Sequence, residues 1–244
     1  MDRFVYDQMA AAQSKHWWFV GRRKIFKRVI ENIPLPASAS ILEIGAGTGA
    51  NLEMLSKFGD VVACENDDES RGYCASNGWN TIAGRLPSGI SEIEGKYDLI
   101  CLFDVLEHVE SDGESIRELK GLLKLNGILL IACPAYQWLY GDYDRILGHY
   151  RRYNSSTLSN LLAREGYVIS RIGYFNTILF PLSIFGRLVE LLGVNVRSKS
   201  IKTPISLINK VLEILFSLEA LIVGRVLFPF GTTVLVQAEV KRNI

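Results

Sequence analysis

A glycine-rich loop at residues 45–49 (Gly-Ala-Gly-Thr-Gly) follows an apolar run at 40–45 and leads into an amphipathic stretch at 49–58. Glycines allow a sharp backbone turn and the close approach of a ligand where a Cβ would intrude. Strand, glycine loop and helix in this order indicate a site for a nucleotide-like cofactor. With Ala50 the loop also fits the dinucleotide pattern G-x-G-x-x-A, and Glu65 follows at the spacing of that pattern, so a dehydrogenase is an alternative at this point.

Short β-rich runs alternate with amphipathic stretches from residue 39 onward, which is the pattern of parallel βαβ units and predicts the α/β fold class. Strands are predicted at 40–45, 60–65, 79–83, 97–103, 127–133, 167–173 and 232–240. Helices are predicted at 24–32, 49–58, 68–77 and 112–124, and another begins at an N-cap at Asn154 and ends at Gly166.

A long segment separates the last two predicted strands, where an open sheet would need only a turn. Within it, residues 204–228 are predicted to form one long helix, because polar or small residues recur every three or four positions and leave a wide apolar face. We expect a helical insertion at 176–229 that serves as extra core, as a lid, or as a contact with a membrane surface or a second copy of the chain through 177–228.

Composition excludes several classes of protein. The chain is 48% apolar and 22% charged, which argues against disorder. Its four cysteines lie far apart without a CxxC pair, which argues against a disulfide framework or a zinc ribbon. A net charge of +1 with scattered basic residues argues against nucleic acid as a partner, although the basic ends could meet anionic lipid. No run of about 18 apolar residues is present, so we expect a cytoplasmic protein, with the inner face of the membrane as a candidate peripheral site.

Three segments together resemble one family. Residues 42–49 (Leu-Glu-Ile-Gly-Ala-Gly-Thr-Gly) resemble motif I of the class I S-adenosylmethionine-dependent methyltransferases. Residues 104–109 (Asp-Val-Leu-Glu-His-Val) look like the signature after the fourth strand in the ubiquinone-type O-methyltransferase branch. Residues 123–130 are similar to the L-K-P-G-G turn of these enzymes, with Leu125 and Asn126 in place of Pro and Gly. The resemblance implies a Rossmann-like, seven-stranded, mostly parallel sheet with an antiparallel last strand, and it disfavours a dehydrogenase.

The resemblance also implies S-adenosyl-L-methionine as the cofactor. Glu65 can accept hydrogen bonds from both ribose hydroxyls, and Asn66 would border the adenine. An aromatic and basic cluster at 16–23 would fold over the cofactor and bring Arg23, or as second choice Arg22, to the methionine carboxylate. The alternatives are that Glu65 caps the next helix and that the aromatic residues form a hydrophobic staple. The predicted cofactor-binding residues are Arg23, Glu43, Gly45, Ala46, Gly47, Gly49, Glu65, Asn66, Gly84, Arg85, Leu86 and Phe103.

The loop after the fifth predicted strand, 127–133, is the expected acceptor site. It combines aromatic rings, carboxylates, a histidine and paired arginines, which suit a polyhydroxylated or phosphorylated acceptor. Its string at 148–153 (Gly-His-Tyr-Arg-Arg-Tyr) looks like one found in methyltransferases of bacterial surface-saccharide and lipid pathways. The predicted acceptor-binding residues are Tyr136, Tyr150, Arg151 and Arg152. A structural loop is the alternative.

His149, and after it His108, are the candidate general bases if the acceptor is a hydroxyl. No spacing of His, Cys and carboxylates indicates a metal, although some O-methyltransferases use magnesium.

The sequence therefore predicts three parts: an N-terminal lid and helix at 1–38, a cofactor-binding domain at 39–175 and 230–244, and the insertion at 176–229. The expected activity is methyl transfer from S-adenosylmethionine to a small-molecule or lipid- or saccharide-linked acceptor, at a hydroxyl oxygen. A catalytically silent accessory protein, which binds the cofactor and recruits a membrane-associated partner through the apolar helix, is the alternative. A nucleic-acid methyltransferase is disfavoured, because the N/D-P-P-Y/F signature is absent after the fourth strand.

Overall fold

A single sheet of seven strands organises the computed structural model, which describes residues 8, 10–91, 93–193 and 204–241. The strand order is β3-β2-β1-β4-β5-β7-β6. The five strands from β1 to β5 pair in parallel, and β7 runs antiparallel between β5 and β6. The predicted Rossmann-like sheet with an antiparallel last strand is therefore confirmed. The strands are β1 (Ala39–Ile44), β2 (Gly59–Cys64), β3 (Asn80–Ile82), β4 (Tyr97–Phe103), β5 (Leu123–Pro134), β6 (Tyr167–Phe175) and β7 (Thr233–Val240).

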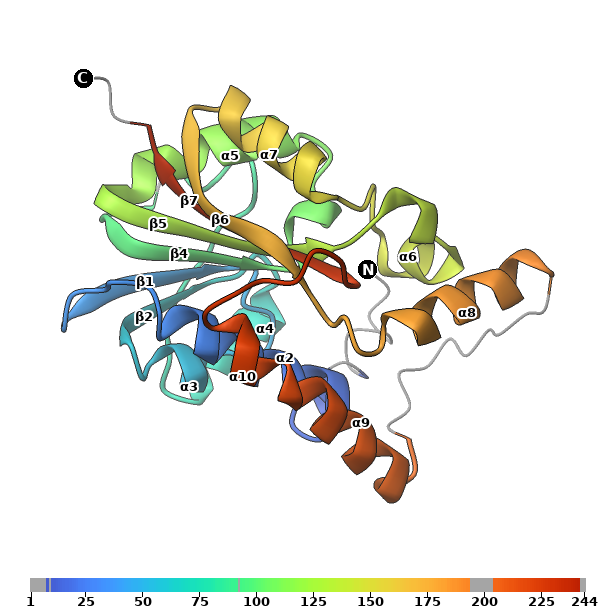
Figure 1. Cartoon of the computed structure of the whole chain (residues 1–244). Coiled ribbons are helices and arrows are strands. Elements are labelled where there is room, and N and C mark those ends of the chain that lie inside the picture. The colour runs from blue at the N-terminus through green and yellow to red at the C-terminus, as the bar shows by residue number, and fades with distance from the viewer. Residues whose placement is uncertain (1–7, 9, 92, 194–203, 242–244) are drawn as a thin grey trace.

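Helices cover both faces of the sheet, with α5 and α7 on one face and α2, α3 and α10 on the other (Figure 1). The helices are α2 (Trp17–Ile30), α3 (Leu52–Leu55), α4 (Asp68–Ser76), α5 (Asp112–Leu119), α6 (Asp142–Leu147), α7 (Ser155–Arg164), α8 (Phe180–Leu191), α9 (Ser206–Leu218) and α10 (Ala220–Val223). Short 3₁₀ turns are η1 (Leu106–His108), η2 (Lys120–Leu122) and η3 (Gln137–Leu139).

An apolar core lies on each face of the sheet, because side chains alternate between the two faces along a strand. Neighbouring residues of a strand point to opposite faces, so Ile41 packs in the core under α2 while Leu42 packs in the core under α5 and α7. Strands buried on both faces read as continuous apolar runs, which is why these segments were predictable from the sequence.

Helix α2 begins earlier than predicted. It starts at Trp17, not at residue 24, so the aromatic and basic cluster forms the first turns of the helix and does not precede it. His16 caps the helix by accepting a hydrogen bond from the Trp18 amide at Nδ1, 3.2 Å away. Histidine is not among the usual N-cap residues, and the sequence therefore gave no start signal there.

Helix α9 packs along α2 and ties the insertion to the N-terminal segment. Asn209 Oδ1 accepts a hydrogen bond from the Trp17 amide at 3.0 Å, and Lys24 Nζ lies 2.8 Å from Glu213 Oε1. The rings of Trp17 and Phe216 meet edge to face at 5.8 Å. These contacts place one part of the predicted insertion against the predicted lid.

The helix predicted at 204–228 is divided in two by Glu219. This carboxylate is buried and accepts hydrogen bonds from the amides of Asn176 and Ile178, at 2.6 and 2.7 Å. It thereby anchors the chain that leaves β6. The sequence did not indicate this role, because Glu219 lies 43 residues after the first amide that it binds.

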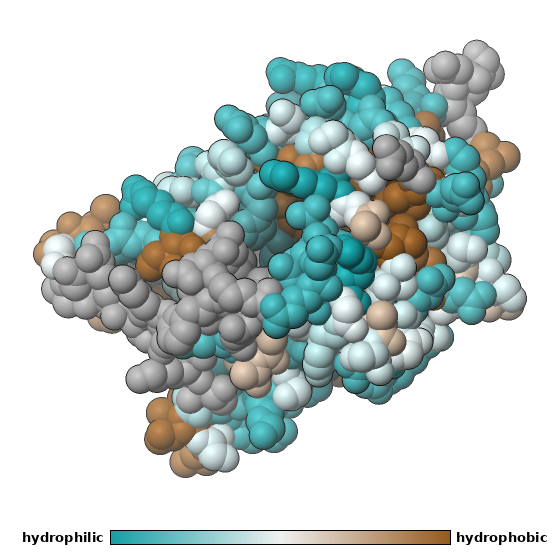
Figure 2. Space-filling model, turned by 180° about the vertical axis from the view of Figure 1, so that it is seen from behind, coloured by the Kyte–Doolittle hydropathy of each residue, from teal (hydrophilic) through white to brown (hydrophobic). Residues whose placement is uncertain are grey.

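Helices α8 and α9 project away from the sheet and carry many exposed apolar side chains (Figure 1). Apolar surface gathers at these projecting ends, at the left edge and at the lower left of Figure 2. The exposed apolar residues of the two helices include Leu182, Phe185, Leu188, Leu191, Leu207, Ile208, Val211, Ile214 and Leu218. Among the described residues, none of the helices combines the length and the apolar character needed to cross a membrane.

Candidate functional site

A cavity of about 1340 Å³ opens at the carboxyl ends of the parallel strands. Loops after β1, β2 and β4 form one side, the first turns of α2 form a second, and the segment from Tyr143 to Arg152 forms a third. Pockets for one small ligand usually measure roughly 300–1000 Å³, so this cavity has room for a cofactor and an acceptor together.

The glycine loop turns into this cavity as predicted. Gly45 has a φ of +70°, and a Cβ on it would lie 2.7 Å from the Val105 side chain, so the position requires glycine. The amides of Gly45 and Ala46 donate to the carbonyl of Cys64, which ties the loop to the end of β2. Gly45, Ala46 and Gly47 all line the cavity.

Glu65 faces the glycine loop across the end of β2. Its Oε2 accepts a hydrogen bond from the Gly47 amide at 2.7 Å, and its Oε1 accepts one from the Asp67 amide at 2.8 Å. The predicted meeting of the loop and this carboxylate is therefore observed. The cap of α4 is Asp67, which accepts from the Ser70 amide, so Glu65 is not needed as a helix cap.

Other residues predicted to bind the cofactor fall into two groups. The cavity lining includes Asn66, Gly84, Arg85, Leu86 and Phe103. Glu43 and Gly49 are not in the lining.

Glu43 and Gly49 have packing roles. Glu43 is buried and accepts a hydrogen bond from Asn51 Nδ2 at 2.7 Å; burial raises the pKa of Glu43 to about 8 despite this bond. Gly49 has a φ of +82°, and a Cβ there would meet Leu52 and Cys74. Both residues therefore support the glycine loop from outside the cavity lining.

Two arginines of α2 reach the cavity in different ways. The buried Arg22 pairs through Nη1 with Asp104, and its guanidinium carbon lies 4.2 Å from the centroid of the Trp18 ring. Arg22 Nη2 is buried without a hydrogen-bond partner. Arg23 donates from Nη1 to the carbonyl of Gln13 at 2.7 Å. Both line the cavity, and the unpartnered donor of Arg22 makes it the better placed of the two for an anionic ligand group.

Only some of the residues predicted to bind the acceptor line the cavity. Tyr150 and Arg152 line the cavity. Tyr136 lies outside the lining and stacks on Tyr174, with ring centroids 5.1 Å apart. Arg151 lies outside it as well and forms an ion pair with Asp112 at 2.6 Å. The structure therefore gives Tyr136 and Arg151 structural partners where an acceptor contact was expected.

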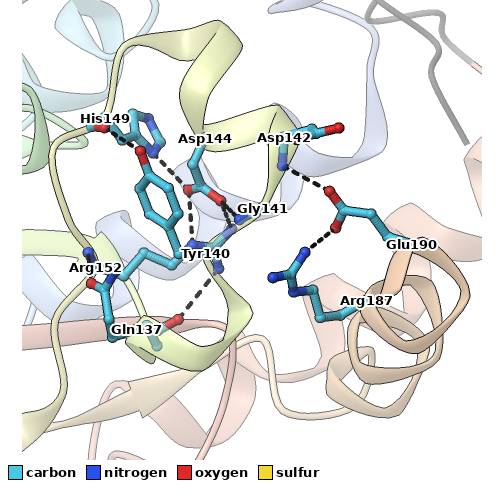
Figure 3. A network of polar contacts seen from close by, with 10 residues as sticks. Gln137, Tyr140, Gly141, Asp142, Asp144, His149, Arg152, Arg187 and Glu190 are labelled. Atoms are coloured by element: carbon cyan, nitrogen blue, oxygen red, sulfur yellow. Dashed lines mark hydrogen bonds and ion pairs between the residues drawn. The ribbon is translucent and has the colours of Figure 1, made fainter. Parts of the chain in front are cut away.

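Asp144 is the centre of a polar network on the predicted acceptor side of the cavity (Figure 3). Its carboxylate accepts from Arg152 Nε and Nη2 at 2.8 and 2.9 Å and from the Gly141 amide at 2.9 Å, and it lies 2.8 Å from His149 Nδ1. Burial opposes the charge of Asp144, but the hydrogen bonds from His149 and Arg152 outweigh it and lower its pKa to about 2. Asp144 is therefore a fixed anion that orients His149.

Helix α8 adds two charged residues beside this network, Arg187 and Glu190, as Figure 3 shows. Glu190 accepts from the Asp142 amide at 2.7 Å and pairs with Arg187 at 2.6 Å. Ser183, Arg187 and Glu190 all line the cavity. No residue of α8 was predicted for the site, because the segment shows no motif and Glu190 lies 48 residues after its partner Asp142.

His108, His149 and Glu107 meet at the acceptor end of the cavity. The two imidazole rings are 4.5 Å apart at 84°, and burial, together with His149, lowers the pKa of His108 to about 4. One possible ligand atom from each of the three residues lies within 4.8 Å of the others. The structure therefore brings together three residues that could hold a metal ion, although no spacing in the sequence indicated such a group. Spacing along the chain gave no sign of it, because His149 lies far from the other two in sequence.

Comparison with known proteins places this geometry in a family. Residues 17–171 match the family model described as "Methyltransferase domain". A curated protein known from two strains of Mycobacterium tuberculosis, named "Probable S-adenosylmethionine-dependent methyltransferase", is 21% identical over 169 residues. That match covers 66% of this chain and 60% of the relative, so the chain spans less than two thirds of the relative's length.

Solved structures with similar folds include two from archaea. One, from Haloferax volcanii, belongs to a complex of the Trm112 methyltransferase activator with a methyltransferase; it has a TM-score of 0.61 and 11% identity, and the match covers 98% of this chain and 99% of that one. The other, a SAM-dependent methyltransferase from Archaeoglobus fulgidus, has a TM-score of 0.57 and 16% identity, with 88% and 93% of the two chains covered. At these identities the likeness concerns the fold.

Proposed function

The chain belongs to the methyltransferase-domain family, and from this membership we propose that it binds S-adenosylmethionine and transfers its methyl group to a hydroxyl oxygen of a small-molecule or lipid- or saccharide-linked acceptor. The observation that carries the proposal is the pairing of the glycine loop with Glu65 at the edge of a cavity that has room for two ligands. When bound, S-adenosylmethionine supplies an electrophilic methyl group on a good leaving group.

The cofactor end of the cavity offers groups for each part of such a ligand. The glycines would let the loop backbone lie close to the ligand, and the carboxylate of Glu65 has lone pairs left for ribose hydroxyls after accepting two amides. Phe103 and Leu86 supply apolar surface for the base. Arg22, whose Nη2 has no other partner, is our choice for the methionine carboxylate, with Arg23 beside it.

The acceptor end would position a nucleophile. Methyl transfer requires an aligned approach more than it requires chemical assistance, so the network of Asp144, Arg152 and His149 would serve mainly to orient the acceptor. His149, held by Asp144, is the candidate proton acceptor, and His108 is second. The packing of α9 on α2 supports the helix whose first turns form one wall of the cavity.

The proposal is tested by titrating the chain with S-adenosylmethionine in a calorimeter and by incubating it with methyl-tritiated cofactor in a cell extract. We expect saturable binding of one cofactor per chain and a labelled small molecule or lipid. Absence of heat and of label would refute the proposal. Cofactor binding without any labelled product, across extracts of several sources, would favour the accessory protein that binds the cofactor without activity.

The exposed apolar faces of α8 and α9 support a second proposal, contact with an anionic membrane surface. Exposed apolar patches of this extent mark interaction sites, and residues 141–244 carry 13 basic and 7 acidic side chains, which suits anionic lipid. We expect the chain to float with vesicles that contain phosphatidylglycerol, and the double change Phe185→Asp and Leu188→Asp to abolish flotation. If the chain instead stays with the soluble fraction and dimerises in light scattering, the faces bind a second copy.

A further inference from the structure

Glu107, His108 and His149 form a cluster that the methyl-transfer proposal does not fully use. Glu107 and His108 belong to η1, directly after β4, and His149 follows α6. All three line the acceptor end of the cavity, and one ligand atom from each lies within 4.8 Å of the others. We infer that these three residues bind a divalent transition-metal ion of the series from Mn²⁺ to Zn²⁺.

The carboxylate of Glu107 is the observation that points to a cation. Its side chain is fully buried, and neither of its oxygens has a hydrogen-bond partner of normal geometry. The thiol of Cys133, a weak donor, and the Arg22 guanidinium lie near this carboxylate, while Asp104 adds a second negative charge. The Arg22 guanidinium pairs with Asp104 and not with Glu107. A buried carboxylate without a partner is costly, and a cation between the carboxylate and the imidazoles would remove that cost.

The two imidazoles are oriented in the manner of metal ligands. His149 Nδ1 lies 2.8 Å from Asp144 Oδ1, which leaves Nε2 for a ligand. His108 lies close to the backbone of Gly148. A metal-binding histidine usually donates its second ring N–H to a carboxylate or a backbone carbonyl, and His149 has such a partner in Asp144. Asp144 is itself fixed by two hydrogen bonds from Arg152.

The ligand atoms of the three side chains determine which metal ions the cluster would prefer. Two imidazole nitrogens and one carboxylate oxygen suit zinc and its first-row neighbours, whereas Mg²⁺ and Ca²⁺ prefer oxygen ligands alone. Ligand atoms around such an ion lie about 3–3.5 Å apart, so the side chains need to draw together by about an ångström.

Three protein ligands leave positions open toward the cavity, where an acceptor oxygen can bind. A metal-bound hydroxyl loses its proton more easily. This role for the ion rests on the proposed function. With the ion bound, His149 is a ligand and the proton leaves to solvent, so no imidazole base is required.

The test is calorimetric titration of the full chain, freed of any histidine tag and stripped with a chelator, with Mn²⁺, Zn²⁺ and Mg²⁺ in turn. We expect one Mn²⁺ or Zn²⁺ per chain and at least about tenfold weaker binding of Mg²⁺. Glu107→Gln preserves the shape of the side chain and removes its charge, so it should fold at least as stably as the wild type yet bind Mn²⁺ and Zn²⁺ at least about 100-fold more weakly. His149→Gln should show a similar loss, and Asp144→Asn, which acts through His149, a loss of about 10–100-fold.

Glu114→Gln, a change of an exposed carboxylate on α5, is the matched control and should bind as the wild type does. Absence of saturable binding, or equal binding by the wild type and Glu107→Gln, would overturn the inference. Titration of the same samples with S-adenosylmethionine separates the two proposals. Cofactor binding without metal binding defeats only this inference, and metal binding without cofactor binding defeats only the proposed function.

Discussion

Replacement of Glu65 by alanine is expected to weaken the binding of S-adenosylmethionine by about 10²- to 10⁴-fold. A hydrogen bond that involves a charged group contributes about 1.5–3 kcal/mol, and the carboxylate can make two such bonds with the ribose hydroxyls. Alanine also removes the acceptor for the Gly47 amide, which lies 2.7 Å from Glu65 Oε2, and so loosens the glycine loop. Calorimetric titration of the folded variant measures the loss.

Two other substitutions make this prediction specific. Glu65→Gln keeps one acceptor oxygen and should lose affinity to an intermediate extent. Glu69→Ala removes an exposed carboxylate from the first turn of α4 and should leave the dissociation constant unchanged. Equal affinity of Glu65→Ala and the wild type would show that the cofactor does not sit between the loop and this carboxylate.

Phe26→Ala is expected to reduce the free energy of unfolding by about 3–5 kcal/mol, the usual cost of truncating a buried phenylalanine. Phe26 is 2% exposed, stacks on Phe103 with centroids 3.9 Å apart at 8°, and meets Phe175 edge to face. It is the main apolar link between α2 and the floor of the cavity. For a chain of this size the melting temperature should fall by roughly 6–20 °C.

Urea and thermal unfolding measure this effect, and Phe26→Leu should recover most of the stability because it refills the space. Phe185→Ala, at a position 63% exposed on α8, is the control and should change the unfolding free energy by less than about 0.5 kcal/mol. A melting temperature of Phe26→Ala within a degree of the wild type would mean that α2 contributes little to the fold.

Local patterns in the sequence were sufficient to predict the sheet and the meeting of the glycine loop with Glu65. The strands are apolar runs separated by turn-forming residues. The glycine loop and Glu65 follow the adjacent strands β1 and β2, so the topology of the sheet brings them together. Local geometry also explains why Asn126 can stand where the similar L-K-P-G-G turn has glycine. Asn126 has a φ of +65°, a conformation that asparagine tolerates well, so the turn survives the loss of glycine.

The acceptor end could not be predicted to the same extent, because its contacts join distant parts of the chain. The pairing of Arg22 with Asp104, the approach of Glu190 to Asp142, and the meeting of Glu107 with His149 each depend on how helices dock on the sheet. Residue types indicated candidate acceptor-binding residues, but they could not tell that Arg152 lines the cavity and that Arg151 does not.

The docking of α9 on α2 has a consequence for the order of events during synthesis. The wall of the cavity that carries Arg22 is fastened at Trp17 and Lys24 to residues almost two hundred positions later in the chain. A ribosome-bound chain that has released every residue of the glycine loop and the parallel strands therefore still lacks the support for this wall. Ligand capture has to wait until α9 has emerged from the exit tunnel, and nascent chains arrested before residue 204 should not retain the cofactor.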